Sequence, residues 1–214
     1  MEDFIIPKYS DFEGIQLSIY DAEAIHCGGN QYWFTKKMHK LSGCGPVAAA
    51  NITAYLAKFK PDKYAKLYPY EGVINKKDYT KHLQEVRDYV KPGPFGLTSV
   101  TQFVDNVQDF CKSKELTLTP HILEENATMH QALDFISEAL HEKLPIAILV
   151  LKHPVKELDD YTWHWMTILN LKLNYEHKKH YIAVSTYGEL HEIDLDLLWN
   201  HRRPTDIIRL AYFS

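Results

Sequence analysis

The stretch that decides the fold is Ser42-Gly43-Cys44-Gly45-Pro46-Val47-Ala48-Ala49-Ala50-Asn51. It predicts a helix from about Cys44 to Phe59, because a proline in the first helical turn costs no hydrogen bond. Within residues 47–57 only Asn51 and Thr53 are polar, and a helix that is apolar on nearly all sides is usually buried. We therefore expect a central helix with a cysteine at its N-terminus.

A thiol in that position has distinctive chemistry. The unpaired N–H groups and the positive end of the helix dipole both favour the thiolate, which is the nucleophilic form. The glycines that flank Cys44 leave its sulfur open to a substrate, and its backbone N–H can supply half of an oxyanion hole. The simpler reading is an inert core cysteine, since free cysteines are often buried.

A nucleophilic thiol needs a base, and His164 is the best placed of twelve histidines. It lies in Tyr161-Thr162-Trp163-His164-Trp165-Met166, at the start of a predicted strand, where the backbone is rigid and the neighbouring tryptophans can exclude water. Most other histidines, such as His82, lie in polar contexts and are expected to be solvated or to cap helices. His26 lies beside Cys27, but no second ligand pair has usable spacing, so we predict no metal site.

Elsewhere the sequence changes from helical to strand patterns. Apolar residues at helical spacing predict helices around residues 79–90, 100–111 and 128–141, the last with Thr128 as N-cap. Apolar and alternating runs then predict strands at 145–151, 165–173, 181–185, 190–193 and 207–213, with a short helix near 195–201. Helices followed by strands indicate an α+β fold with an antiparallel sheet. We expect one domain over residues 1–214: an irregular segment at 1–40, a mainly helical part at 41–142 and a mainly sheet part at 143–214.

Composition narrows the function classes. The chain has 214 residues, 45% of them hydrophobic, and a net charge of −4, which fits a globular protein and no nucleic-acid partner. The N-terminus does not resemble a signal peptide, and no stretch approaches the roughly 18 apolar residues of a membrane helix. Three irregularly spaced cysteines predict neither a disulfide framework nor structural zinc. We expect a cytoplasmic protein without a cofactor or a membrane partner.

The run from Gly43 to Asn51 resembles the nucleophile helix of papain-like cysteine peptidases, and most resembles the subgroup of bacteriocin-leader-processing peptidase domains and related bacterial proteins. The chain order agrees, with the cysteine on a central helix and the histidine on a strand of the following sheet. The resemblance covers residues from about 30 to the C-terminus. It implies a papain-like fold and a peptide or amide substrate.

Two departures from the family pattern concern the supporting residues. The family orients its histidine with Asn or Asp on the next strand, and the matching segment, residues 182–188, places Ser185 there. Either Ser185 orients His164, or one of the aspartates 159, 160 and 194 does, or the site is degenerate. The family's oxyanion glutamine lies about six residues before the cysteine, where this chain has Met38. Asn30 and Gln31 are the nearest upstream amides, and we favour Gln31.

Two classes of function follow. In the first, the Cys44 thiolate attacks a carbonyl, His164 transfers the proton, and water or an amine resolves the acyl-enzyme, which gives a hydrolase or an acyltransferase. In the second, the scaffold is catalytically inactive and binds a peptide in the cleft. The sequence determines neither the substrate nor the oligomeric state.

Overall fold

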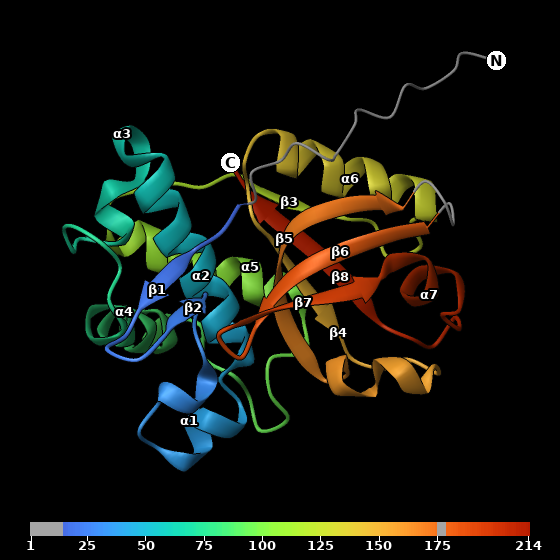
Figure 1. The fold of residues 1–214 in the computed structure, drawn as a ribbon, viewed down its shortest axis with the longest axis horizontal. Coiled ribbons are helices and arrows are strands. Elements are labelled where there is room, and N and C mark those ends of the chain that lie inside the picture. Colours follow the sequence, from blue (N-terminus) through green and yellow to red (C-terminus); the bar gives the residue numbers. More distant parts are fainter. Residues whose placement is uncertain (1–14, 175–178) are drawn as a thin grey trace.

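The computed structural model describes residues 15–174 and 179–214, so residues 1–14 of the expected irregular segment lie outside it. Most helices precede residue 142, and most of the antiparallel sheet follows it (Figure 1). The predicted α+β class and its order of helices before strands are confirmed. None of the described helices is long and apolar enough to cross a membrane.

The predicted helices form close to their expected bounds. Helix α6 begins after Thr128, whose side chain forms a capping box with Gln131. The segment before the central helix adds a short helix, α1, that the sequence patterns did not reveal. The α-helices are α1 (Lys37–Leu41), α2 (Cys44–Phe59), α3 (Pro61–Tyr64), α4 (Lys76–Tyr89), α5 (Val100–Ser113), α6 (Met129–His141) and α7 (Leu195–Asn200), and the 3₁₀ helices are η2 (Gln31–Trp33), η3 (Ala65–Leu67) and η4 (Lys156–Tyr161).

The main sheet has the strand order β3-β8-β4-β5-β6-β7, and every neighbouring pair is antiparallel. Its edge strand β3 is only three residues long, starts with a proline and was not predicted. The strands are β3 (Pro120–Ile122), β4 (Ile146–Val150), β5 (His164–Asn174), β6 (Lys179–Thr186), β7 (Glu189–Asp194) and β8 (Ile208–Phe213). A separate hairpin pairs β1 (Ser18–Tyr20) with β2 (Ile25–Cys27).

Helices cover both faces of this sheet. On β8, Phe213 lies against Phe103 of α5, whereas the adjacent Tyr212 lies against Phe135 of α6, as expected where successive side chains of a strand point to opposite faces. Helix α2 packs against β4 and β5, and in Figure 1 it lies between the sheet and helices α3 and α4.

Thirteen residues of α2 are buried, which confirms the prediction of a buried central helix. Strand β4 is also buried along its whole length. Because α2 is enclosed on all sides, its N-terminal Cys44 is held against the start of β5. The fold thus brings the two residues predicted to be chemically active to the same place.

Candidate functional site

A narrow cavity lies where the N-terminus of α2 meets β5 and β6. Its volume of about 10 Å³ leaves room for about one water molecule. Cys44 and His164 both line it, although they are far apart in the sequence. Its other lining residues include Gln31, Asn51, Trp165, Ser185, Thr186 and Tyr187.

Cys44 is the first residue of α2 and is partly buried. Burial raises the pKa of its thiol, and the backbone N–H groups of Trp165, Gly45 and Cys44 itself oppose that rise. The sequence predicted that the helix N-terminus would favour the thiolate. The N–H groups do act in that direction, but desolvation is the larger effect in this narrow cavity.

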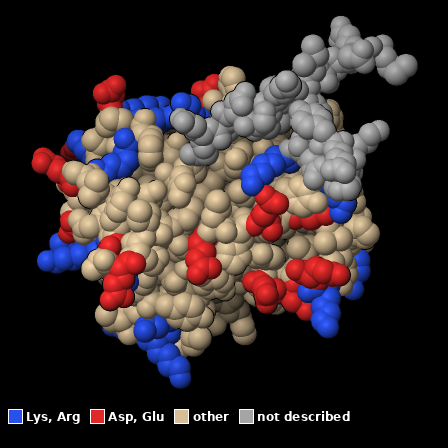
Figure 2. Space-filling view, viewed as in Figure 1, with Lys and Arg blue, Asp and Glu red and all other residues tan. Residues whose placement is uncertain are grey.

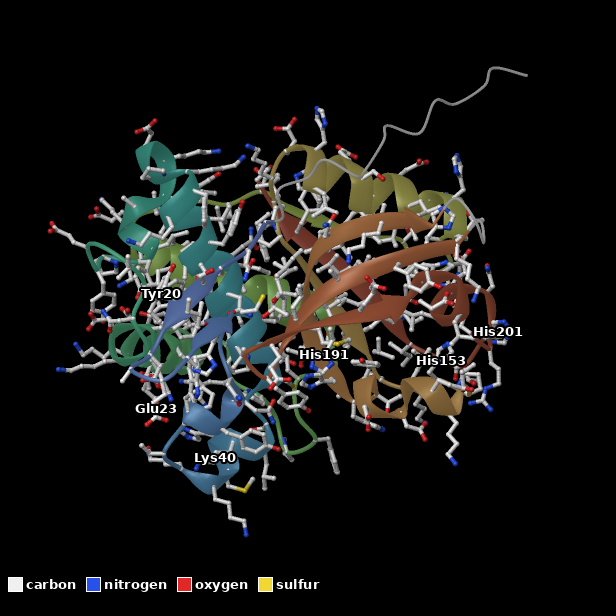
Figure 3. The ribbon with its side chains drawn as sticks, viewed as in Figure 1. Tyr20, Glu23, Lys40, His153, His191 and His201 are labelled. Carbon is white, nitrogen blue, oxygen red and sulfur yellow. The ribbon has the colours of Figure 1, made fainter. Side chains whose placement is uncertain are left out.

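His164 is the first residue of β5 and is 5% exposed. Its Nε2 lies 2.6 Å from the Thr186 hydroxyl, at the end of β6. Burial, and secondarily the charge of His191, lower the pKa of His164 to about 4. The imidazole is therefore neutral at pH 7, and a neutral imidazole can accept a proton. His191 is labelled on β7 in Figure 3.

The prediction that Ser185 orients His164 is wrong by one residue. The Ser185 hydroxyl donates to the Cys27 carbonyl at 2.7 Å and accepts from the Asn51 side chain at 3.3 Å. Adjacent strand residues point to opposite faces, so Thr186 is the residue that reaches the imidazole.

The alternative aspartates do not replace Thr186. Asp159 and Asp160 are exposed on η4, and Asp194 caps α7 and pairs with Lys179. Within residues 15–174 and 179–214, no carboxylate hydrogen-bonds to His164. The side-chain group that contacts Nε2 of His164 is therefore an uncharged hydroxyl.

Asn51 is a central residue that sequence reasoning left without a role. It lies two turns after Cys44 on α2 and is 3% exposed. Its Oδ1 accepts from the backbone N–H of Gly29 at 2.8 Å and from the Tyr79 hydroxyl at 2.6 Å. Its Nδ2 donates to the hydroxyls of Thr167 and Ser185, each at 3.3 Å. This amide joins α2 to β5, β6, α4 and the N-terminal segment, and the sequence signal for it was a polar residue in an otherwise apolar helix.

Tyr187 covers His164 from the β6–β7 turn. Its ring stacks on the imidazole with centroids 4.8 Å apart and planes 11° from parallel. Tyr187 and Gly188 have φ values of 53° and 80°, the pattern of a type I′ turn. Position one of that turn favours asparagine or glycine, so a tyrosine there is strained. Strained residues of this kind concentrate at functional sites.

The two tryptophans beside His164 have different environments. Trp165 is 2% exposed, stacks on Phe103 with centroids 4.3 Å apart, and donates its indole N–H to the Leu97 carbonyl at 2.6 Å. Trp163 is 57% exposed. Only Trp165 is in a position to exclude water, whereas the sequence prediction assigned that effect to both.

Gln31 lines the same cavity as Cys44, and its side-chain amide donates to the Lys40 carbonyl at 2.7 Å. Asn30 is directed elsewhere, with its Nδ2 donating to the Tyr187 carbonyl at 2.5 Å. Of the two upstream amides, Gln31 is therefore the one that shares the cavity with Cys44.

Two histidines outside the cavity complete the comparison with the sequence. His82, expected to be solvated, is fully buried, and its Nε2 lies 3.0 Å from the Thr53 hydroxyl. His26 packs against Trp33. The described part of the chain contains no group of three His, Cys, Asp or Glu side chains arranged to hold a metal ion.

Comparison with known proteins does not assign this chain to a family. No protein-family model matches the chain, and no curated protein matches it.

Proposed function

We propose that this protein is a thiol-dependent hydrolase that cleaves a peptide or amide bond through an acyl-enzyme on Cys44, with a papain-like arrangement of its catalytic groups. The observation that carries the proposal is the shared cavity of Cys44 and His164, in which Thr186 binds Nε2 of the imidazole. A nucleophile, a base and a group that orients the base form the minimal set for this chemistry.

The steps balance without a cofactor. In this proposal the Thr186 hydroxyl accepts a hydrogen bond from the protonated Nε2, so the other ring nitrogen, Nδ1, is unprotonated and can act as the base. His164 takes the thiol proton as the sulfur of Cys44 attacks the substrate carbonyl. The tetrahedral intermediate collapses with loss of the amine, which receives that proton, and a thioester remains. Water, activated by the same imidazole, then releases the acid and regenerates the thiol.

The developing oxyanion needs hydrogen-bond donors. The backbone N–H of Cys44, at the N-terminus of α2, is one donor, and the helix dipole supports it. The Gln31 side chain is the second in this proposal. One of its amide protons already binds the Lys40 carbonyl, which holds the group in place and leaves the other proton available.

The pKa directions support a neutral thiol and a neutral imidazole at rest. Burial raises the pKa of Cys44 and lowers that of His164 to about 4. We therefore propose that the proton moves to His164 only as the carbonyl is attacked. A hydroxyl at position 186 fits this order, because it need not neutralise a permanent imidazolium.

A second candidate is a catalytically inactive peptide-binding module. Two observations favour it: the cavity has room for only about one water, and no carboxylate contacts His164 in the described residues. Acyl transfer to an amine would use the same first step as hydrolysis.

The test is acylation by p-nitrophenyl acetate, which needs no knowledge of the natural substrate. We expect a burst of p-nitrophenol and a single acetyl group on Cys44, located by peptide mass spectrometry. Cys27 and Cys111 are internal controls, because both are buried and burial raises their pKa values to about 11 and 12. His164→Ala should slow acylation at least about 100-fold, whereas His141→Ala, at an exposed position, should not.

The deacylation step separates the alternatives. Release of acetate in water alone supports the hydrolase, and release only after addition of an amine such as glycine methyl ester supports an acyltransferase. Equal labelling of wild type and His164→Ala would contradict the catalytic proposal and favour the binding module.

A further inference from the structure

The segment that leads into the nucleophile carries an unusual set of charges. No aspartate or glutamate occurs between Glu23 and Asp62, although the whole chain has a net charge of −4. Within that acid-free interval, Lys36, Lys37 and Lys40 lie on or beside α1. Figure 2 shows Lys and Arg side chains projecting from the end of the molecule where Figure 1 places α1, and Figure 3 labels Lys40 there.

No neighbouring carboxylate neutralises these three lysines. Seven other lysines form ion pairs, for example Lys114 with Glu85 and Lys179 with Asp194, but across the described residues Lys36, Lys37 and Lys40 form none. Lysines such as Lys63 and Lys77 are also unpaired, so what sets these three apart is the absence of acidic residues between Glu23 and Asp62. Their charges are therefore available to a partner.

Arg87 of α4 adds an independent observation on the neighbouring helix. Its guanidinium lies 6.0 Å from the ring centre of Phe34, it forms no ion pair in the part of the chain described, and its buried Nε has no hydrogen-bond partner. The charges of Arg87 and Lys36 both act on His39 of α1, which places the cations around one point. Asp88 is the carboxylate whose charge acts there. A partly buried guanidinium without a partner is suited to bind a carboxylate.

Apolar side chains accompany the charges. Met38 and Leu41 are each 66% exposed. They are three residues apart and so share one side of the helical turn, next to the side that carries Lys37 and Lys40. We call Lys36, Lys37, Met38, Lys40, Leu41 and Arg87 the α1 face. A surface with basic side chains next to apolar ones is complementary to a polypeptide segment that carries both acidic and apolar side chains.

The α1 face is directly connected to the candidate active site. Gln31 lines the cavity and binds the Lys40 carbonyl. Gly43, next to Cys44, packs so closely against the His39 carbonyl and the Phe34 ring that a side chain there would clash. The α1 face therefore adjoins the cavity that Cys44 lines, within reach of a polypeptide bound there.

We propose that the α1 face is a substrate exosite that binds an acidic and apolar segment of the polypeptide cleaved at Cys44. The substrate class is thus a peptide with glutamate or aspartate and aliphatic residues on one side of the scissile bond. This inference rests on the proposed function for its role in catalysis, but the binding itself can be measured separately.

The probe is a fluorescein-labelled 12-residue peptide of Glu, Leu and Gly, titrated with the full chain carrying Cys44→Ser and followed by anisotropy. A peptide with Lys in place of Glu is the reference. We expect saturable binding of the acidic probe only, and weakening as NaCl rises from about 50 to 200 mM. Lys37→Glu/Lys40→Glu should reduce affinity about tenfold, the effect of reversing two surface charges.

Matched variants make the result specific. Lys63→Glu/Lys77→Glu changes the net charge equally at exposed positions on α3 and α4, and it should leave affinity within about twofold. Met38→Ser/Leu41→Ser should weaken binding without changing charge. Equal loss in both lysine double variants would overturn the proposal, as would the absence of saturable binding.

Two further outcomes are decisive. Sedimentation with phosphatidylserine vesicles that depends on Lys37 and Lys40, without peptide binding, would overturn the proposal and assign the face to a lipid surface. Peptide binding at the α1 face in a protein whose Cys44 is not acylated by p-nitrophenyl acetate would leave the exosite standing and refute the hydrolase. Each of the two proposals can therefore be refuted without refuting the other.

Discussion

Replacing Thr186 with valine tests the central contact of the proposed site. Valine has nearly the same shape as threonine but lacks the hydroxyl, so it removes the 2.6 Å hydrogen bond to His164 Nε2 and little else. Thr186 and His164 are both buried, with exposed fractions of 3% and 5%.

The magnitude follows from these values. Leaving a buried polar group without its partner costs about 1–3 kcal/mol. Loss of the hydroxyl also lets the proton move to the other ring nitrogen, which then cannot act as the base. If about 1.4–2.8 kcal/mol of this cost appears in the transition state for acylation, the rate falls about 10- to 100-fold.

The assay is the burst of p-nitrophenol from p-nitrophenyl acetate, together with the unfolding midpoint in urea. Thr186→Ser keeps a hydroxyl and should recover most of the rate. Ser185→Ala is the matched control one residue away, because its hydroxyl binds Asn51 and the Cys27 carbonyl instead of the imidazole. It should lower stability while leaving the acylation rate per folded molecule unchanged.

The opposite pattern would refute this reasoning. If Ser185→Ala abolished acylation while Thr186→Val retained it, Ser185 would be the orienting residue, and the contact between Thr186 and His164 would have no catalytic role.

Three further predictions concern stability. Burial lowers the pKa of His82 to about 3 and of His164 to about 4, so as pH falls below about 6.5 the unfolded chain binds protons before the folded protein does. The free energy of unfolding is therefore highest above pH 6.5 and falls toward pH 4 by about 1 kcal/mol per pH unit for each histidine. Urea unfolding at a series of pH values should show a shallower fall for His82→Gln. Asn51→Leu leaves the Gly29 N–H and the Tyr79 hydroxyl without their acceptor and should cost about 3 kcal/mol or more by the same measurement. Gly28→Ala places a methyl group against Ser185 at a φ of 72° and should lower the free energy of unfolding by about 2–4 kcal/mol. Gly72 has the same φ, but a methyl group there meets no neighbouring atom within 4 Å. Gly72→Ala therefore measures the backbone strain alone.

The sequence was most informative where a local rule decides the structure. Helix α2 has the predicted bounds, Cys44 to Phe59, because a proline in the first turn and a continuous apolar run specify both its start and its burial. Thr128 was found as an N-cap for the same reason. The strands from β4 onward were found because their apolar and alternating runs are unambiguous, whereas β3 has only three residues and no pattern.

The supporting residues of the site were harder to predict because they depend on register. Moving one residue along a strand moves a side chain to the other face of the sheet. A short motif placed Ser185 at the imidazole of His164, whereas in the observed register Ser185 pairs with Thr167 and the next residue, Thr186, reaches the ring. His82 was misjudged because neighbouring polar residues do not reveal which side of a helix faces the core.

Tyr187 also bears on how this protein would respond to laboratory evolution. A selection for heat resistance alone favours residues that relax a strained turn, and asparagine or glycine at position 187 would do so. Either replacement would remove the ring stacked on His164. Screens for thermostability alone should therefore select replacements of Tyr187 that raise the unfolding temperature and slow the proposed acylation of Cys44. A screen that also measures acylation should retain the tyrosine.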